Sequence, residues 1–384
     1  MVATDKPAYK VVGTRPIRPD GLDKVTGRAT YGSDIKLEDM LYGAVLRSPH
    51  AHARIKRLDT SKAAALPGVF AVATNADFPQ VESSTMSIGE GTANPVWLID
   101  NLLAGAKVLY HGHAVAAVAA IDQHVAEDAL QLIEVEYEVL PAVVDVREAM
   151  LDTAPILHDD LRTAVRARGV EPAPDRRTNV ASHLRLEKGD LEAGFAAAEV
   201  VIEREYETAM FHQGYIEPQN ATAWWDSDGN ITVWTSVQGS FNARDQIAAV
   251  LKVPVSRIKV VPMEIGGGFG GKLRVYMEPI AAMLAKKSGK PVKVTMTREE
   301  VIQATGPASG THIRAKIGAT KDGRITAASL HMLFEAGAFP GSPVGGGMNV
   351  SFAPYDIPNV QMDGYDICVN RPRNAAYRAP GAPA

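Results

Sequence analysis

The stretch "MEIGGGFGGKLRV" (Met263–Val275) holds five glycines within six positions, and a lysine follows them at once. Its letters satisfy two nucleotide-binding patterns. Gly266, Gly271 and Lys272 fit the start of a phosphate-binding P-loop, G-x-x-x-x-G-K. Gly266, Gly268 and Gly271 fit the dinucleotide pattern G-x-G-x-x-G. Each pattern makes a further chemical demand on its neighbours.

Neither demand is met fully. A P-loop requires Ser or Thr after the lysine, because that hydroxyl binds the magnesium ion, and this chain has Leu273. The dinucleotide pattern requires a clean strand before the glycines, and Pro262 lies within the strand predicted over 256–265. It also requires an acidic residue roughly 20 positions on, whereas Glu299 and Glu300 lie farther away.

Both patterns share one physical feature. Glycines at a strand end expose backbone N–H groups and let the main chain approach a ligand, and the start of a following helix favours an anion. Phe269 is the only side chain between the glycines. The stretch therefore predicts a site for a cofactor with a flat ring and phosphate groups.

The chain divides into four parts. Residues 1–20 form an N-terminal arm, 21–150 an α+β segment, 151–180 a polar linker and 181–384 a second α+β segment. In the first segment, strands are predicted over 41–48, 54–60, 113–121 and 134–140, and a helix over 122–133 with an aspartate as its N-cap. In the second, helices are predicted over 240–253, with Ser240 as N-cap, and over 275–290, closed by Gly289.

Composition narrows the class of protein. The 384 residues are 46% hydrophobic and 22% charged, with a formal net charge of -4 and no long block of like charge, so neither nucleic acid nor a membrane surface is an expected partner. The start lacks the layout of a signal peptide, and no apolar run approaches the roughly 20 residues of a membrane helix. A cytoplasmic protein is expected. Because Cys368 is the single cysteine, any iron–sulfur cluster has to lie on another chain.

Several longer stretches resemble one known family. "GLDKVTGRATYGSDIKLEDMLYGAVLRSPHAHARI" (21–55) and "KVLYHGHAVAAVAA" (107–120) resemble its a/b hammerhead domain. Four further stretches resemble the cofactor loops of the family and occur in the same order: "MFHQGYIEPQNATAWW" (210–225), "VWTSVQGSFNARDQIA" (233–248), "GGGFGGK" (266–272) and "NRPRNAAYRAPGAP" (370–383). This family is the molybdenum hydroxylases of the xanthine oxidase/aldehyde oxidase type. The resemblance is to the N-terminal half of their molybdenum-cofactor-binding large subunit, and it implies an α+β fold in which a hammerhead domain precedes the first molybdopterin-binding domain.

The resemblance also assigns roles to residues. Gln238 matches the glutamine whose amide approaches a terminal oxygen of molybdenum, Phe269 lies in the loop that holds the pterin, and Arg378 matches an arginine lining the molybdenum site. All three are expected near the metal, and Gln238 and Arg378 are the expected catalytic residues. The complete expected cofactor-binding set is Gln238, Gly267, Gly268, Phe269, Gly270 and Arg378.

The activity that the resemblance implies is hydroxylation of an electron-poor C–H carbon. A molybdenum-bound hydroxide attacks the carbon, hydride passes to a sulfido ligand, and electrons leave through 2Fe–2S and FAD subunits. The expected cofactor is molybdenum–molybdopterin in its cytosine dinucleotide form, and the complex is expected to dimerise. Two alternatives remain: a non-catalytic relative that binds no metal, and a P-loop ATPase.

Departures from the family pattern bear on the substrate. Purine-hydroxylating members carry a glutamate where this chain has Leu273, and an arginine near the glycine-rich "PVGGGMNV" (343–350). The "YRAPG" loop (377–381) lacks the cysteine of the carbon-monoxide-oxidising branch. A neutral pocket is therefore expected, suited to an aldehyde or to an aromatic or N-heterocyclic C–H compound.

The chain ends at Ala384, six residues after Arg378, whereas family subunits of this type are much longer. The resemblance implies that the catalytic base, a glutamate, belongs to the half that this chain lacks. A tight complex with a C-terminal-half partner is expected.

Other polar residues have simpler interpretations. Glu217, in "YIEPQN", is interpreted as a support for the cofactor loops rather than as a general base. The pairs His50/His52 and His111/His113 have the spacing of strand-borne metal ligands, but no carboxylate or cysteine completes a set. They are interpreted as packing residues.

Overall fold

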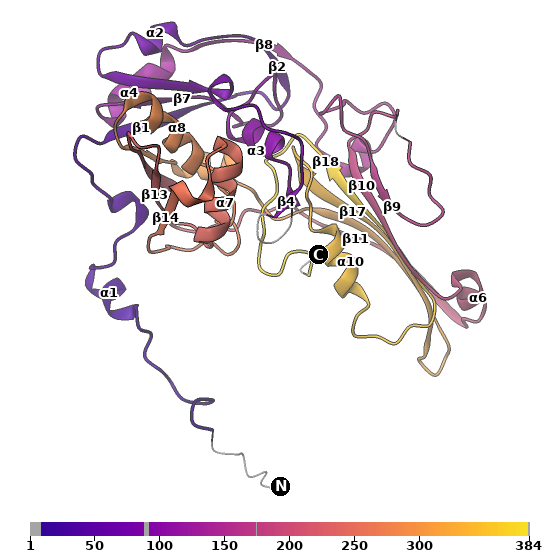
Figure 1. Cartoon of the computed structure of the whole chain (residues 1–384). Coiled ribbons are helices and arrows are strands. Elements are labelled where there is room, and N and C mark those ends of the chain that lie inside the picture. Colours follow the sequence, from indigo (N-terminus) through magenta and orange to yellow (C-terminus); the bar gives the residue numbers. More distant parts are fainter. Residues whose placement is uncertain (1–8, 88–91, 174, 383–384) are drawn as a thin grey trace.

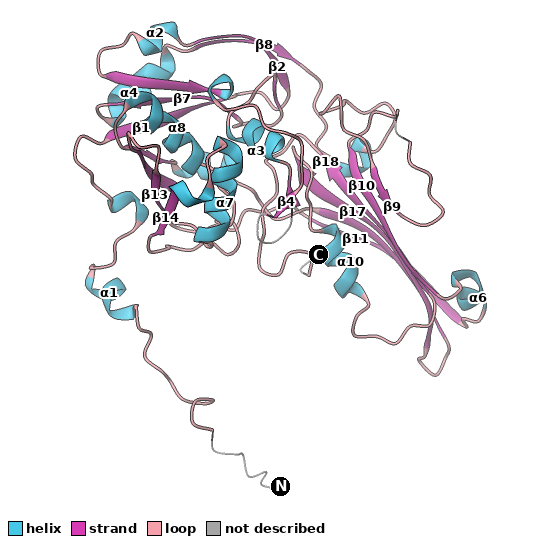
Figure 2. Ribbon diagram, in the orientation of Figure 1, coloured by secondary structure: helices cyan, strands magenta, loops and turns pink. Residues whose placement is uncertain are grey.

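The fold is built on two large β-sheets with helices packed on them (Figure 1). The computed structural model describes residues 9–87, 92–173 and 175–382. Figure 2 shows helices α7 and α8 against one sheet, while the long strands of the other extend to the opposite side of the molecule. The first sheet has seven strands, in the order β14 (Ile258–Pro262), β13 (Ile231–Thr235), β12 (Asn220–Trp225), β15 (Val292–Thr295), β1 (Leu41–Arg47), β7 (Ala114–Ala120) and β3 (Val69–Thr74).

This sheet joins the two predicted α+β segments. Strand β1, from the first segment, pairs in parallel with β15, from the second, with Leu41 opposite Val292. Strand β7 lies between β1 and β3 and is buried along its whole length, as expected for an apolar run that pairs on both sides. One continuous core therefore lies beneath strands from both segments.

The second sheet has six strands and carries the C-terminal loop. Short strand β9 lies within the predicted linker 151–180 and pairs in parallel with β10 at one edge. Strand β11 forms the other edge and is exposed along almost its whole length. The order is β11 (Val200–Thr208), β16 (Thr311–Ala319), β17 (Ile325–Gly337), β18 (Val360–Cys368), β10 (Val180–Lys188) and β9 (Ala164–Arg166).

Two small sheets and the helices complete the fold. A three-stranded sheet has the order β6 (Lys107–Val108), β2 (Ala53–Asp59) and β8 (Glu134–Val139), and β4 (Met86–Ser87) pairs with β5 (Thr92–Ala93). The α-helices of the described residues are α1 (Gly21–Thr26), α2 (Ser61–Ala64), α3 (Pro95–Leu102), α4 (Gln123–Gln131), α5 (Val146–Ala149), α6 (Leu191–Ala196), α7 (Ser240–Leu251), α8 (Glu278–Ser288), α9 (Arg298–Ala304) and α10 (Val344–Ser351). Short 3₁₀ helices cover Gly32–Asp34, Asn75–Asp77 and Val255–Arg257.

The predicted helix ends are confirmed in part. The Asp122 side chain caps α4 by accepting from the Val125 backbone N–H, and Gly289 closes α8 with a φ of 65°. The N-cap prediction for α7 is wrong: Gly239 is the cap, and Ser240 is already the first helical residue.

Two further differences concern the glycine stretch. Pro262 ends β14, an edge strand, where its missing N–H breaks no ladder bond. Helix α8 begins at Glu278 rather than at 275, with a proline in its first turn. A loop therefore separates the glycines from the helix.

Within 9–87, 92–173 and 175–382, none of the helices has both the length and the apolar character that crossing a bilayer requires.

Candidate cofactor site

The glycine run forms a compact loop that does not end on a helix. The Gly271 N–H donates to the Gly268 carbonyl at 2.7 Å, and Phe269 has a φ of 52°. The N-terminal turn of α8 holds a carboxylate of its own, because Glu278 accepts from the Tyr276 N–H at 2.8 Å. The expectation that this helix start favours a bound anion is therefore wrong.

Close contacts require glycine at four positions of this loop, Gly266, Gly268, Gly270 and Gly271, and two of these contacts join it to other parts of the site. A Cβ on Gly270 would lie 2.5 Å from the Ala376 carbonyl oxygen, and the φ of Gly270 is 105°. A Cβ on Gly268 would lie 2.7 Å from Oε1 of Gln238. Glycine thus lets the main chain pack directly on two other loops.

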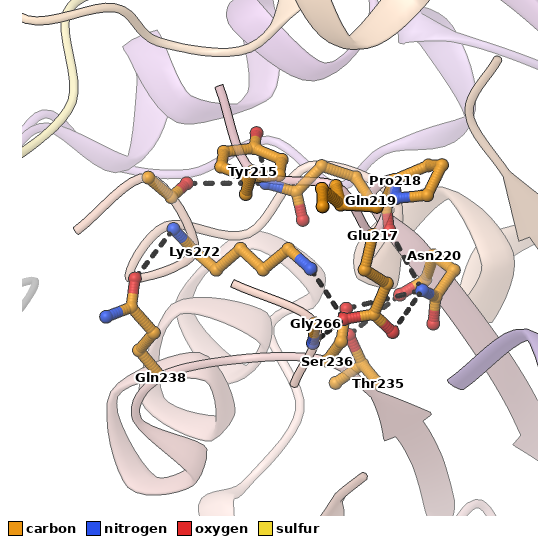
Figure 3. A network of polar contacts seen from close by, with 12 residues as sticks. Tyr215, Glu217, Pro218, Gln219, Asn220, Thr235, Ser236, Gln238, Gly266 and Lys272 are labelled. Atoms are coloured by element: carbon orange, nitrogen blue, oxygen red, sulfur yellow. Dashed lines mark hydrogen bonds and ion pairs between the residues drawn. The ribbon is translucent and has the colours of Figure 1, made fainter. Parts of the chain in front are cut away.

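Gln238 lies beside this loop and fixes its shape. Its Oε1 accepts from the N–H groups of Gly270 at 2.8 Å and Lys272 at 3.1 Å. Figure 3 shows its amide nitrogen pointing away from Lys272. That nitrogen has no hydrogen-bond partner in the part of the chain that the structure describes. Gln238 therefore holds the loop with one atom and presents a free donor with the other.

Arg378 reaches the same loop from the C-terminal end. Its N–H donates to the Phe269 carbonyl at 3.1 Å, and its guanidinium lies 5.6 Å from the Phe269 ring centroid. Phe269, Arg378 and Ala379 all have positive φ values, of 52°, 23° and 52°. Such strained backbone persists where the surroundings impose it, and it concentrates at functional sites. The structure thus brings together Gln238, Phe269 and Arg378, which were predicted from three separate motifs.

Lys272 does not face a ligand. Its side chain is fully buried, and Nζ donates to Oε2 of Glu217 at 2.7 Å (Figure 3). The same carboxylate oxygen accepts from the Gly266 N–H at 2.7 Å. Burial lowers the pKa of Lys272, and its bond to Glu217 opposes that shift. This geometry supports the interpretation of Glu217 as a loop support and does not support a P-loop, whose lysine must reach a phosphate.

Gln213 is a positioning residue that the sequence analysis missed. Its Nε2 donates to the carbonyls of Gly306 at 3.0 Å and Ala376 at 2.8 Å. It therefore ties the C-terminal loop to the segment after α9. Its place in "MFHQGYIEPQNATAWW", one of the matching stretches, was the available signal.

A cavity of about 810 Å³ adjoins the C-terminal loop, sharing Ala376 and Pro380 with it. Its charged lining residues are Arg162, Arg166, Arg274 and Asp366. The lining of this cavity is therefore charged, and the neutral substrate pocket expected from the departures at Leu273 and 343–350 stays a prediction. Leu273 occupies the position of the glutamate that purine-hydroxylating members carry, and the cationic Arg274 follows it directly.

Two of the four histidines, His52 and His113, have backbone partners, and His52 Nδ1 lies 2.7 Å from the Pro141 carbonyl. His113 accepts from the Leu109 N–H at 3.2 Å through Nδ1, and its Nε2 lies 2.7 Å from the Asp100 carbonyl. Among the described residues, no group of three or more His, Cys, Asp or Glu side chains is placed to hold a metal ion.

Comparison with known proteins identifies the class to which this fold and loop arrangement belong. Residues 26–141 match the aldehyde oxidase and xanthine dehydrogenase a/b hammerhead domain, and residues 172–384 match the molybdopterin cofactor-binding domain. The chain belongs to the xanthine oxidase/aldehyde oxidase family of molybdenum hydroxylases. More particularly, it corresponds to the N-terminal half of the family's molybdenum-cofactor-binding large subunit.

Individual relatives support this placement. The chain is 32% identical to the nicotinate dehydrogenase large molybdopterin subunit of Eubacterium barkeri, over 98% of this chain and 83% of that protein. It is 36% identical to the carbon monoxide dehydrogenase large chain of Afipia carboxidovorans, over 96% of this chain and 45% of that protein. The solved structure of quinoline 2-oxidoreductase from Pseudomonas putida 86 superposes with a TM-score of 0.83 at 28% identity, covering 96% of this chain and 46% of that one. Apart from the nicotinate dehydrogenase subunit, these relatives are about twice as long as the part they share with this chain.

Proposed function

We propose that this chain is the molybdenum-cofactor-binding part of a multi-subunit hydroxylase that oxidises a C–H bond of an aldehyde or of an aromatic or N-heterocyclic compound. The observation that carries the proposal is the convergence of Gln238, Phe269 and Arg378 on one glycine loop. When bound, the molybdenum cofactor supplies the oxidation of C–H to C–OH, and the protein supplies orientation and electrostatics.

The residues of the loop fit a pterin with a dithiolene end. Gly267, Gly268 and Gly270 carry no side chains, so on either side of Phe269 the loop consists of main-chain groups alone, which a ligand can approach closely. The Phe269 side chain is 42% exposed and therefore open to contact with a flat ring. In this proposal Gln238 donates its free amide N–H to the cofactor and Arg378 lines the same edge.

Gln238→Glu separates the two roles of Gln238. The carboxylate still accepts from Gly270 and Lys272 but no longer presents the amide donor. We expect molybdenum content within about twofold of wild type, with kcat lower by about 100-fold, the typical effect of removing one preorganised donor. Metal analysis and steady-state rates measure the two quantities. Gln238→Leu is the control, because it also removes the hydrogen bonds to Gly270 and Lys272 and should lower both molybdenum content and kcat. An unchanged kcat in Gln238→Glu would refute the donor role.

The remaining cofactors are proposed for partner chains. Cys368 is the single cysteine of this sequence and is fully buried, which supports placing the 2Fe–2S clusters on another subunit. FAD is proposed for a further subunit from the family resemblance alone. We propose the cytosine dinucleotide form of molybdopterin, a cytoplasmic location and a dimeric complex, following the family resemblance. A non-catalytic relative that binds no metal is the alternative.

An exposed apolar groove supports a partner carrying the second half of the family subunit, including the base glutamate. Strand β11 presents Val200, Ile202 and Tyr206 to solvent, and Ile317 of β16 lies beside them. Alternate residues share one face of a strand. This groove, of about 190 Å³, is apolar apart from Arg204. Contiguous exposed apolar surface of this kind marks protein interfaces. The 83% coverage of a relative named as a large molybdopterin subunit is consistent with a divided subunit.

Ile202→Glu tests this groove. The side chain is 53% exposed, so the substitution should leave the chain folded. If the C-terminal-half partner covers the groove, a buried unpaired carboxylate should weaken their association by at least about 100-fold. Co-purification and analytical ultracentrifugation of the two expressed halves measure the effect. Val255→Glu is the control, because Val255 is 47% exposed and lies in a 3₁₀ helix before β14 of the other sheet. Equal association of Ile202→Glu and wild type would show that the partner binds elsewhere.

A further inference from the structure

Strand β11 is an open edge of the six-stranded sheet. It pairs with β16 on one side, over the whole of Val200–Thr208 and without a register shift, and no described strand pairs with it on the other side. On that free side the backbone N–H and C=O groups have no partner within the sheet. Natural edge strands are usually short, bulged or interrupted by proline. Strand β11 has nine residues and contains no bulge, glycine or proline.

Both faces of β11 are open as well. Its three glutamates share one face of the strand, and Ile202 and Tyr206 share the other. Every side chain from Val200 to Glu207 is exposed. Strand β8 is a second edge strand with alternating glutamates, but its Val135 and Tyr137 pack against the core. Unlike β8, β11 therefore leaves apolar side chains and a backbone edge uncovered together.

The pairing with β16 shows which side chains suit β11. Basic residues stand opposite its glutamates, and apolar residues stand opposite its apolar positions. The facing pairs are Glu203 and Lys316, Glu205 and Arg314, Glu207 and His312, Ile202 and Ile317, and Tyr206 and Ile313. Oε1 of Glu203 lies 3.7 Å from Nε of Arg314, and Oε2 lies 4.0 Å from Nζ of Lys316, so neither contact is a hydrogen bond. The glutamates therefore keep the capacity to bind basic side chains on the free side.

A second copy of this chain is a poor match for that edge. Antiparallel pairing of two copies over the full strand places Arg204 opposite Arg204 and Glu203 opposite Glu205. Moving the centre of the pairing to Glu203 or Glu205 sets glutamate against glutamate. Like charges directly opposite each other destabilise a strand pair. The edge therefore favours a different strand, in which basic and apolar residues alternate.

The chain that completes the cofactor site is the best candidate to supply this strand. Thr208 ends β11, and the chain continues directly to Gln213, which holds the C-terminal loop through the Ala376 carbonyl. A strand added to β11 would therefore lie beside the start of a segment that belongs to the site. In the longer relatives the matched part is about half of the protein, so the other half is covalently joined to this fold.

We propose that β11 accepts a strand of the C-terminal-half partner, which carries Lys or Arg opposite the glutamates and apolar residues opposite Ile202 and Tyr206. The added strand extends the six-stranded sheet by a seventh. Main-chain hydrogen bonds supply affinity in such strand addition, and alternating side chains supply specificity. The apolar side chains of the added strand continue the groove that Ile202 and Ile317 line. The inference rests on the proposed function, because it states how the partner proposed there binds.

Amide hydrogen exchange of β11 tests strand addition directly. Alternate N–H groups of the strand face β16, and the others face the free edge. In the chain alone, the amides on the free edge of Val200–Thr208 should exchange rapidly. In the complex with the C-terminal half they should exchange at least about 100-fold more slowly, because they now donate to the added strand. The amides of β8 are the control and should not change. If β11 exchanges equally in both samples, the proposal is overturned.

The double substitution of Glu203→Lys with Glu205→Lys tests the basic pattern of the partner strand. Both side chains are exposed, so the chain should still fold. The new lysines face the basic residues of the partner, and association should weaken at least about tenfold at low salt and less at high salt. Analytical ultracentrifugation of the two halves measures the effect. Glu134→Lys with Glu136→Lys on β8 is the matched control, with no expected change. Association as tight as that of wild type would count against the proposal.

Competing occupants of the edge give different results. If a second copy binds it, the chain alone sediments as a dimer and its β11 amides are already protected, which overturns the proposal. Protection that requires the iron–sulfur or FAD subunit instead of the C-terminal half also overturns it. A complex that contains molybdenum but shows no change at β11 retains the proposed function and loses this inference. A complex without molybdenum in which β11 becomes protected loses the function and retains the inference.

Discussion

Replacing Lys272 with alanine is expected to lower the free energy of unfolding by about 3–5 kcal/mol, because it leaves the buried Glu217 carboxylate without its counter-ion. That carboxylate also accepts from the Gly266 N–H, so the loss extends to the glycine loop. Urea unfolding followed by circular dichroism measures the change. A P-loop lysine would behave differently: the variant would keep its stability and lose only ATP hydrolysis.

Two controls isolate this effect. Lys62→Ala removes one partner of the exposed pair with Glu134 and should change stability by no more than about 1 kcal/mol. The double substitution of Lys272→Met with Glu217→Gln removes both charges and should recover part of the loss, since the two residues are directly coupled. An Lys272→Ala protein as stable as wild type would contradict the buried-pair account.

Replacing Gly270 with alanine is expected to abolish cofactor binding. The new Cβ would lie 2.5 Å from the Ala376 carbonyl, and the φ of 105° is unfavourable for any L-residue with a side chain. The loop would therefore separate from the C-terminal loop and from Gln238, whose Oε1 accepts from the Gly270 N–H. Molybdenum content of the purified complex should fall at least about tenfold, because backbone strain of this kind and the clash together exceed about 1–3 kcal/mol.

Gly323→Ala is the matched control for Gly270→Ala. Gly323 has a φ of 93°, close to that of Gly270, but nothing lies within 4 Å of an added Cβ. It lies in the turn between β16 and β17. An alanine there therefore has the backbone strain of a positive φ but makes no close contact through its Cβ. Molybdenum content should stay near that of wild type. If Gly270→Ala and Gly323→Ala lose molybdenum equally, general destabilisation explains the loss, and the contact between Gly270 and Ala376 does not.

The sequence predicts most elements of the fold because their signals are local. An aspartate before an amphipathic run is enough to place α4, and a glycine after a lysine pair is enough to end α8. The start of α8 was missed although Pro279 is a helix-start signal. The continuous apolar pattern before it extended the predicted helix too far.

Only part of the candidate site could be predicted from the sequence. Gln238, Phe269 and Arg378 were identified from family motifs, and the structure brings them into contact through the glycine loop. The partner of Lys272 was not predictable from spacing, because Glu217 lies 55 residues earlier and only the tertiary fold buries both. The charged lining of the cavity was not predictable from spacing either, since Arg166, Arg274 and Asp366 come from segments far apart in the chain.

The central claim is that this chain holds a molybdenum–pterin cofactor in the cradle formed by Gln238, Gly270 and Arg378. The most direct test is the molybdenum and pterin content of the complex purified with all its subunits, by inductively coupled plasma mass spectrometry and fluorescence of the oxidised pterin. The account predicts molybdenum and pterin equimolar with this chain in wild type and in Gly323→Ala, and their loss in Gly270→Ala. A complete complex without molybdenum, or a Gly270→Ala complex that retains it in full, would contradict the account.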